Sequence, residues 1–235
     1  MIHVDGLDGR VAVVTGAARG IGRRIAEVLA DHGARVAVLD LNPSDVDGVL
    51  AIECDVSDPE AVGAAFTEIE ARLGAPSVLV IGAAIFPVVP FEQTSPELWE
   101  RTLAINLTGA FLVARRALPG MRAQGYGRIV GIGASAGKGG GSGSVAAYAA
   151  SKAGLMTLMK SIAHEYARDG ITANAVAPAF IDTGLIAARE VADRIPVGRY
   201  GTVDEVAAAA VFLCSAHAGY ITGEILDING GTLVD

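Results

Sequence analysis

Seven short apolar runs alternate with longer amphipathic segments along the whole chain, and this alternation restricts the fold more than any other feature. The runs are almost continuous in Val, Ile, Leu and Ala. A strand has this composition when both of its faces are covered, as in a parallel sheet. The expected strands are RVAVVT (10–15), ARVAVLD (34–40), VLAIEC (49–54), SVLVIG (77–82), GRIVGIG (127–133), ITANAVA (171–177) and EILDI (224–228).

Helical periodicity fills the intervals between these runs. The expected helices are 21–31, 60–73, 97–124, 146–168 and 204–216. Two of them begin with a capping residue and a proline at the first helical position, Asp58-Pro59 and Ser95-Pro96. With right-handed crossovers, the alternation predicts an α/β fold, a Rossmann-like doubly wound parallel seven-stranded sheet in a single domain over residues 1–235.

Composition excludes several classes of function. A formal charge of −8 argues against nucleic acid or an anionic membrane surface as the main partner. The most apolar segment, 77–91, is broken by two prolines and is too short to span a bilayer, and the N-terminus lacks a secretory pattern, so we expect a cytoplasmic protein. Cys54 and Cys214 are isolated and the four histidines are scattered, so we expect buried thiols and no metal site.

A glycine-rich segment, TGAARGIG (15–22), joins the first strand to the first helix. Gly16, Gly20 and Gly22 are spaced as GxxxGxG, which differs from the commoner GxGxxG pattern. Glycines let the backbone turn tightly and approach a pyrophosphate, which then lies at the helix N-terminus. The alternative is a glycine-rich turn that binds no ligand.

Asp40 ends the second strand, at the distance from the glycine loop where an acid accepts hydrogen bonds from an adenosine ribose. A carboxylate there repels a 2′-phosphate, so Asp40 favours NAD over NADP. Arg19, inside the glycine loop, can partly offset this repulsion. The alternative for Asp40 is a solvated acid at a strand end.

Together with a Tyr148–Lys152 pair, these features resemble the short-chain dehydrogenase/reductase family over essentially the whole chain. The motifs that carry the resemblance are TGAARGIG (15–22), CDVSD (54–58), INLTG (105–109), YAASK (148–152) and ITANAVAP (171–178). Each motif alone is modest evidence. Their common order and spacing make the resemblance specific.

The resemblance implies a catalytic role for three residues. Tyr148 matches the acid/base that exchanges a proton with the substrate oxygen while hydride passes to or from a nicotinamide. Free tyrosine has a pKa of about 10, and Lys152, one helical turn further on, is expected to lower it together with the oxidised nicotinamide. The resemblance also implies that Lys152 binds the nicotinamide ribose, and that Asn106 holds a water in the proton relay.

Other positions match cofactor contacts of the family. Asp55 and Val56 match the residues beside the adenine ring, and Ala83 lies where a small side chain backs the cofactor. The segment PAFIDT (178–183) matches the part that cradles the nicotinamide carboxamide and the pyrophosphate. The full set of expected cofactor contacts is Gly16, Arg19, Gly20, Ile21, Gly22, Asp40, Asp55, Val56, Ala83, Tyr148, Lys152, Pro178, Ile181 and Thr183.

The chain also departs from the family pattern. Where the family has paired asparagines, this chain has Ile81-Gly82-Ala83-Ala84, so hydrogen bonds to neighbouring strands must be missing or replaced. The usual Pro-Gly is Pro178-Ala179, which requires a backbone conformation that an L-residue adopts. The connection 41–48 is too short for the helix often found there, so we expect a more exposed adenine.

The position of the family's catalytic serine differs by one residue between two ways of counting. Counting forward from the fifth strand gives Ala134, whereas counting back from Tyr148 gives Ser135. We assign Ser135, because it carries a hydroxyl and loops absorb one residue readily. Ser142, Ser144 or no serine at all are the alternatives. We expect the glycine-rich stretch 137–145 to form a bare, mobile rim on which Lys138 is the only long side chain.

The favoured function is an NAD-dependent oxidoreductase acting on a secondary alcohol or ketone. One alternative is an NADPH-dependent 3-oxoacyl reductase, favoured by the short segment between Thr183 and Pro196; another is a dinucleotide-binding protein without catalysis. The expected pocket walls, 85–91, 137–145 and 180–195, are mainly small or apolar with Arg189 and Arg194 nearby, which favours an apolar or alicyclic substrate. The resemblance further implies a homotetramer.

Overall fold

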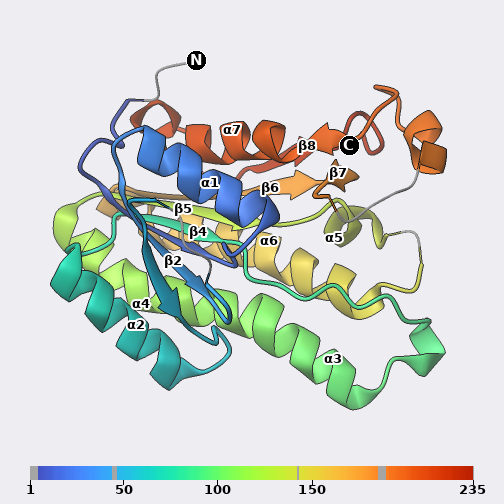
Figure 1. Ribbon diagram of the computed structural model, residues 1–235, viewed down its shortest axis with the longest axis horizontal. Coiled ribbons are helices and arrows are strands. Elements are labelled where there is room, and N and C mark those ends of the chain that lie inside the picture. Colours follow the sequence, from blue (N-terminus) through green and yellow to red (C-terminus); the bar gives the residue numbers. More distant parts are fainter. Residues whose placement is uncertain (1–4, 44–46, 142, 185–188, 235) are drawn as a thin grey trace.

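The computed structural model describes residues 5–43, 47–141, 143–184 and 189–234. Seven parallel strands form one sheet in the order β3-β2-β1-β4-β5-β6-β9 (Figure 1). The strands are β1 (Val11–Thr15), β2 (Arg35–Asp40), β3 (Leu50–Glu53), β4 (Val78–Ile81), β5 (Gly127–Ile132), β6 (Ile171–Pro178) and β9 (Ile225–Ile228). The predicted seven-stranded parallel sheet is therefore confirmed.

Helices cover both faces of this sheet. In Figure 1, α1 (Gly20–Asp31) and α7 (Val203–Cys214) lie on one face, and α2 (Pro59–Arg72), α4 (Gly109–Gln124) and α6 (Ala146–Tyr166) lie on the other. Each face has its own hydrophobic core. Val13 packs in the core of α2, α4 and α6, whereas the next residue, Val14, packs in the core of α1 and α7, and both are fully buried. Because successive side chains of a strand point to opposite faces, two covered faces require the continuous apolar runs of the sequence.

Capping residues start three of the helices. The side chain of Asp58 accepts a hydrogen bond from the N–H of Glu60 at the start of α2, and Ser95 accepts one from Leu98 at the start of α3 (Pro96–Leu103). Thr202 and Glu205 form a reciprocal capping box at the start of α7. The two helix starts predicted from a capping residue followed by proline, at Pro59 and Pro96, are confirmed.

The helix predicted over 97–124 is interrupted. It consists of α3, a π-helical turn at Ala104–Thr108 and α4. The extra residue in a π turn widens the helix locally, and such turns are frequent at functional sites. This turn contains Asn106.

Short elements complete the chain. They are 3-10 turns at Phe91–Gln93, Ala167–Asp169, Arg189–Arg194 and Ala216–Ala218, the helical turn α5 (Ala136–Gly139), and a two-stranded sheet of β7 (Ile181–Asp182) and β8 (Gly201–Thr202). Between β2 and β3, no helix is present in the described residues 41–43 and 47–49. Within the part of the chain that the structure describes, no helix is long and apolar enough to cross a membrane.

Candidate active site

The site lies where the order of the strands reverses. β1 pairs with β2 on one side and with β4 on the other, so the chain segments that leave β1 and β4 run to opposite faces at their carboxyl ends. In doubly wound sheets this switch point is where ligands bind. Here it is formed by the glycine loop after β1 and by the segment Gly82–Ala84 after β4.

Two glycines of the loop, Gly16 and Gly22, lie so close to neighbouring backbone atoms that no Cβ fits. Gly16 has φ +69°, and a Cβ there would lie 2.6 Å from the backbone N and Cα of Ala83. A Cβ on Gly22 would lie 2.3 Å from the carbonyl oxygen of Gly16. Gly20 is also left-handed, with φ +59°, but a Cβ there would meet only the Thr183 methyl, at 3.9 Å. Gly16 and Gly22 are therefore required by packing, and Gly20 borders open space.

The first turn of α1 has no side-chain cap. Its N-cap residue, Arg19, makes no capping hydrogen bond, in contrast to the N-cap residues of α2, α3 and α7. The N–H groups of a first helical turn need acceptors, and a phosphate at the positive end of the helix dipole supplies them. The start of α1 is therefore suited to an anionic group.

The side chain of Thr15 binds the segment Gly82–Ala84, which stands where the family has paired asparagines. Its Oγ1 accepts hydrogen bonds from the N–H groups of Gly82 (3.1 Å) and Ala83 (3.2 Å). Thr15 is fully buried at the end of β1. A side chain of the neighbouring strand thus holds the turn after β4 against the glycine loop.

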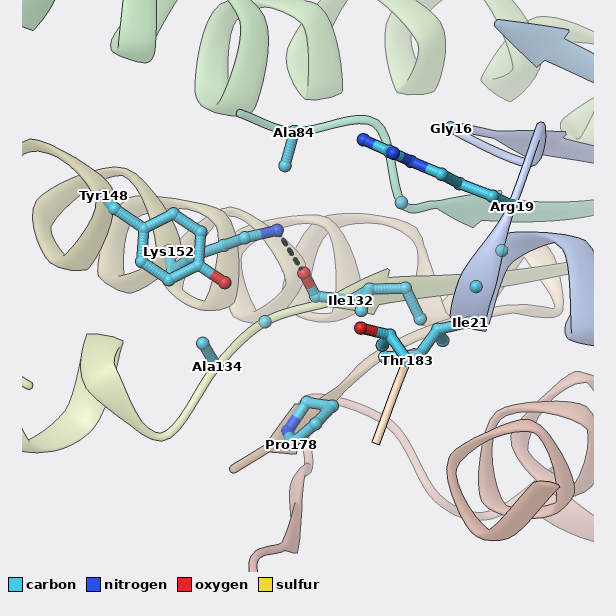
Figure 2. Close-up of a pocket in the computed structure, with 14 residues that line it drawn as sticks. Gly16, Arg19, Ile21, Ala84, Ile132, Ala134, Tyr148, Lys152, Pro178 and Thr183 are labelled. Atoms are coloured by element: carbon cyan, nitrogen blue, oxygen red, sulfur yellow. Dashed lines mark hydrogen bonds between the residues drawn. The ribbon is translucent and has the colours of Figure 1, made fainter. Parts of the chain in front are cut away.

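Two cavities of about 270 Å³ each meet at the glycine loop. The inner cavity (Figure 2) is lined by Gly16, Arg19, Gly20, Ile21, Gly22, Gly82, Ala84, Ile132, Gly133, Ala134, Tyr148, Lys152, Pro178 and Thr183. The outer cavity is lined by Gly16, Ala18, Arg19, Leu39, Asp40, Leu41, Asn42, Cys54, Asp55, Val56, Gly82, Ala83, Ala84, Ile85 and Ile105. The two share Gly16, Arg19, Gly82 and Ala84, so they lie next to each other along the glycine loop.

Both carboxylates of the outer cavity are fixed by hydrogen bonds. Asp40 accepts from the N–H of Ala18 in the glycine loop (3.0 Å) and from the N–H of Asn42 (3.2 Å). Asp55 accepts from the N–H and the hydroxyl of Ser57, at 2.9 and 2.6 Å. The bond to Ala18 places the Asp40 carboxylate directly beside the glycine loop.

Tyr148 and Lys152 lie one turn apart on α6 and both line the inner cavity. Lys152 is almost fully buried, and its Nζ donates a hydrogen bond to the carbonyl oxygen of Ile132 at 2.6 Å (Figure 2). Burial lowers the pKa of Lys152 to about 8 and raises the pKa of Tyr148 to about 12. The pKa of Tyr148 therefore moves opposite to the expected direction, because in the protein alone the loss of solvation of a tyrosinate dominates.

Asn106 lies behind the cavities rather than in their walls. Its side chain accepts from the N–H of Ile85 (2.8 Å) and donates to the carbonyl of Ile85 (3.0 Å) and to the hydroxyl of Ser151 (3.0 Å). Ser151 in turn donates to the carbonyl of Tyr148 at 2.7 Å. Asn106 thus ties the segment after β4 to α6, and its expected role in a proton relay stays a prediction.

A third, apolar cavity of about 500 Å³ adjoins the inner one. Its walls are Phe86, Ala134, Ser135, Ala136, Gly139, Gly141, Val145, Tyr148, Pro178, Ala179, Phe180, Ile181, Thr232 and Leu233. Tyr148 lines both cavities, and its ring meets Phe86 edge to face, with ring centroids 4.6 Å apart.

The two candidate positions for the serine differ in their surroundings. Ala134 lines both the inner and the apolar cavity, whereas Ser135 lines only the apolar one. Ser144 adopts a left-handed conformation, with φ 56°. Ser142 lies outside the described residues, as do residues 185–188 of the expected lid. The role of Ser135 therefore stays a prediction.

The glycine-rich stretch is less bare than its composition suggests. Its first residues form α5, which packs closely on α6. A Cβ added at Gly137 would lie only 2.7 Å from the backbone N of Ala153. Lys138 forms a largely buried ion pair with Asp227 of β9, with Nζ and Oδ2 2.5 Å apart. The rim is therefore tied to the last strand by its one long side chain, which corrects the expectation of a free rim.

Ala179 follows Pro178 without strain. The positive φ of this segment falls one residue later, on Phe180 (φ 50°). The departure from Pro-Gly is thus accommodated as expected, and the left-handed residue is an aromatic one whose side chain lines the apolar cavity.

The adjoining inner and outer cavities fit a nicotinamide dinucleotide. The uncapped start of α1 and the open space at Gly20 suit the pyrophosphate, and Asp40 lines the outer cavity whereas Tyr148 lines the inner one. Sequence reasoning missed Thr15 and Ser151, although Ser151 lies three residues after Tyr148, a spacing that puts both on one side of a helix. No three His, Cys, Asp or Glu side chains among the described residues are arranged to hold a metal ion.

Comparisons with known proteins agree with this geometry. A family model described as enoyl-(acyl carrier protein) reductase matches residues 16–232. MabA of Mycobacterium avium, a 3-oxoacyl-(acyl-carrier-protein) reductase, is 41% identical over 228 residues, covering 94% of this chain and 89% of the relative. FabG of Escherichia coli (strain K12), with the same enzyme name, is 37% identical over 241 residues, covering 95% and 97%. A crystal structure of a candidate gluconate dehydrogenase from Agrobacterium tumefaciens superimposes with a TM-score of 0.90 at 32% identity, covering 97% of this chain and 98% of that one.

Proposed function

Because this chain belongs to the short-chain dehydrogenase/reductase family, whose members are nicotinamide-dependent oxidoreductases, we propose that it reduces an apolar ketone, or oxidises the corresponding secondary alcohol, at Tyr148. One observation carries this proposal. The Tyr148 side chain lines both the space that suits a dinucleotide and the apolar cavity, and Lys152 lies behind it in the inner cavity.

Tyr148 is suited to donate a proton. Burial raises its pKa to about 12, so it holds the phenolic proton at neutral pH. A ketone oxygen in the apolar cavity that reaches this hydroxyl accepts the proton as the carbonyl carbon becomes tetrahedral, and the reverse transfer accompanies alcohol oxidation. The nicotinamide, when bound, supplies or accepts the hydride.

Lys152 and Ser135 support this transfer in different ways. The hydrogen bond to the Ile132 carbonyl fixes the Lys152 ammonium within 5.7 Å of the Tyr148 ring centre, where its charge stabilises the tyrosinate that remains after proton donation. The Ser135 hydroxyl, in the wall of the apolar cavity, donates to the substrate oxygen and polarises the carbonyl.

For the cofactor we propose NAD rather than NADP. The Asp40 carboxylate is held beside the glycine loop by Ala18, where it accepts from ribose hydroxyls and repels a 2′-phosphate. Arg19 is the neighbouring cation in the outer cavity. Replacing Asp40 with Ser is expected to shift the ratio of kcat/KM for NADPH over NADH upward, and an unchanged ratio would contradict the assignment.

A second candidate function rests on the names of the relatives. MabA and FabG are 3-oxoacyl reductases, and a 3-oxoacyl group presents a ketone with an apolar chain, which fits the walls of the apolar cavity. A preference for NADPH together with turnover of 3-oxoacyl thioesters would favour this candidate. A homotetramer also stays part of the proposal, and light scattering on the purified protein tests it.

Turnover of a ketone panel with NADH and NADPH tests the proposed function. Tyr148→Phe is expected to lower kcat roughly 10²- to 10⁴-fold while cofactor affinity stays unchanged, because it removes only the transferred proton. Tyr220→Phe is the matched control, since Tyr220 is fully exposed. Full activity of Tyr148→Phe would overturn the mechanism. Cofactor binding without turnover of any ketone or alcohol would instead support a binding protein without catalysis.

A further inference from the structure

The chain after β9 forms a tight turn built around one buried side chain. Asn229 is buried, and its Oδ1 accepts from the N–H of Gly231 (2.8 Å), while its Nδ2 donates to the carbonyl of Leu233 (2.8 Å). The Thr232 hydroxyl closes the turn by donating to the carbonyl of Asn229 at 2.9 Å. An asparagine that makes all these bonds fixes where the following residues lie.

This turn forms one wall of the apolar cavity. Thr232 and Leu233 line that cavity together with Tyr148 and Ser135. The turn is placed by the sheet, because Ile228 at the end of β9 is the register partner of Pro178 and its carbonyl accepts from the N–H of Ala179 (3.1 Å). The start of the turn is thus bonded to the segment that carries Phe180.

The same turn also borders a smaller cavity. A back cavity of about 150 Å³ is lined by Asn229 and Gly230 of the turn, by the apolar side chains of Ile195, Val197 and Ile228, and by the ion pair between Arg199 and Glu205. Ala179 and Phe180 line both cavities. The turn contributes to both cavities as well, with Thr232 and Leu233 lining the apolar cavity and Asn229 and Gly230 lining the back cavity.

The turn is packed firmly on its far side. Gly230 has φ +61°, and a Cβ there would lie 2.7 Å from Ile195. On the near side, Lys138 links the opposite rim of the apolar cavity to Asp227, two residues before Asn229. Both sides of the turn are therefore held, so Leu233 has a defined position.

We propose that Leu233, positioned by Asn229, determines substrate size by closing the apolar cavity against the back cavity. The ligand is the apolar substituent of the substrate ketone on the side away from the nicotinamide. This inference rests on the proposed function, because it assigns the apolar cavity to the substrate. Wild-type protein accepts substituents that end at Leu233, and removal of that side chain lets a larger substituent extend toward the back cavity.

Two substitutions of Leu233 are expected to act in opposite directions. The small test ketone is cyclohexanone and the large one is dicyclohexyl ketone, which has seven more carbon atoms to accommodate. Leu233→Ala should raise the large-to-small ratio of kcat/KM at least about tenfold, because the added space serves only the larger ketone. Leu233→Phe should lower the same ratio with cyclohexanone turnover retained. The change should appear mainly in KM, since the reacting atoms at Tyr148 are untouched. A ratio that both substitutions leave unchanged, or move in the same direction, would overturn the proposal.

Asn229→Ala tests the positioning role. It should shift the ratio in the same direction as Leu233→Ala, because it releases the turn without changing the cavity side chain. Val234→Ala, at a side chain that is 86% exposed beside Leu233, is the control and should leave the ratio unchanged. A ratio in Asn229→Ala equal to that of wild type would show that Leu233 is held in place without Asn229, and would overturn that part of the proposal.

Ligand binding separates this inference from the proposed function. Affinities of both ketones for the wild type and the Leu233 variants, measured by NMR titration, need no turnover. If no ketone is reduced but the size preference in binding still follows Leu233, the proposed function fails and the assignment of the cavity wall stands. If ketones are reduced but the Leu233 variants bind both ketones with the same preference as wild type, the proposed function stands and the assignment of the cavity wall fails.

Discussion

In the dinucleotide half of the site, around Gly16 and Asp40, close backbone contacts act together with the Thr15 side chain, whereas in the substrate half, around Ser135 and Leu233, side-chain bonds tie the walls to the last strand. In the dinucleotide half, Gly16 lies against the backbone of Ala83, and the Asp40 carboxylate accepts from a main-chain N–H. In the substrate half, an ion pair (Lys138–Asp227) and an asparagine side chain hold the walls.

This difference determines how each half tolerates change. Backbone contacts that exclude a Cβ restrict a position to glycine. The dinucleotide half can therefore be recognised from short sequence motifs. Walls made of side chains accept other side chains of a similar volume. The residues of the substrate half can therefore vary, and substrate specificity can change with them. The predictions below test whether the two halves respond in these two ways.

The largest effect is expected in the dinucleotide half for Gly16→Ala. The new methyl would lie 2.6 Å from the Ala83 backbone at a residue with φ +69°. Left-handed strain of about 1–2 kcal/mol and overpacking of about 1–3 kcal/mol add to a loss of roughly 2–5 kcal/mol in the free energy of unfolding. Urea denaturation measures this loss, and NADH affinity should fall with it.

Gly63→Ala is the matched control for Gly16→Ala. Gly63 lies in α2, and a Cβ there would meet no atom within 4 Å. Replacing a helical glycine with alanine stabilises by roughly 0.5–1 kcal/mol. If Gly16→Ala proved as harmless as this control, the close contact between the two loops would not be what restricts position 16.

Ser135→Ala is the corresponding substitution in the substrate half. Loss of a donor to the substrate oxygen should lower kcat roughly 10²- to 10³-fold with the free energy of unfolding nearly unchanged. Steady-state kinetics and urea denaturation give the two numbers. Gly16→Ala in the dinucleotide half should thus lower the free energy of unfolding, whereas Ser135→Ala in the substrate half should lower kcat.

Ala134→Ser in the Ser135→Ala background resolves which position acts on the carbonyl. Ala134 lines both the inner and the apolar cavity, so a hydroxyl there also borders Tyr148. Full activity of Ser135→Ala alone would reject Ser135. Recovery of activity in the double variant would show that both positions reach the substrate oxygen.

The sequence predicted the sheet and the dinucleotide half because both depend on local patterns. All seven strands follow from apolar runs, and the residues of the glycine loop together with Asp40 line two adjoining cavities. Thr15 was not predicted, because a buried threonine at a strand end has no signature of its own. Its role depends on Gly82 and Ala83, which lie opposite it just after β4, and that pairing is a property of the fold.

The substrate half could be predicted only in part. Tyr148 and Lys152 follow from their spacing on one helix, but Leu233 comes to the cavity from the far end of the chain. The ion pair between Lys138 and Asp227 joins residues 89 positions apart. No short window of sequence contains such contacts, and the glycines around Lys138 suggested a bare loop.

A smaller effect concerns Lys152, which lies between the two halves. Burial lowers its pKa to about 8, so between about pH 8 and 10.5 the unfolded chain binds more protons at this residue than the folded protein does. Its contribution to stability therefore rises with pH across this range and is least favourable below pH 8. Between pH 8 and 10 the rise amounts to about 2 kcal/mol.

Lys152→Met removes this titration. The difference in the free energy of unfolding, wild type minus variant, should increase from pH 8 to pH 10, measured by urea denaturation at each pH. Lys160→Met, at an exposed lysine of the same helix, is the control for the loss of a lysine side chain that is not buried. A difference for Lys152→Met that does not change with pH would mean that buried Lys152 titrates like a solvated lysine.

The smallest effect is expected at Ser144, in the substrate half. Like Gly16, this residue has a left-handed backbone conformation. Ser144 has φ 56°, and its carbonyl accepts from the N–H of Val89 at 2.6 Å. Glycine at this position keeps that bond and relieves left-handed strain of about 1–2 kcal/mol, but costs about 0.4–1 kcal/mol through a more flexible unfolded chain. Ser144→Gly should therefore stabilise by about 0–1.6 kcal/mol in urea denaturation.

Ser144→Ala separates the backbone from the hydroxyl. It keeps the left-handed strain and removes only the side-chain oxygen of an exposed residue, so its free energy of unfolding should match that of wild type. A gain in Ser144→Gly with no change in Ser144→Ala would show that the substrate half carries an L-residue where glycine fits better, at a small cost. Destabilisation by Ser144→Gly would mean instead that the serine side chain helps to hold this wall, as side chains hold the rest of the substrate half.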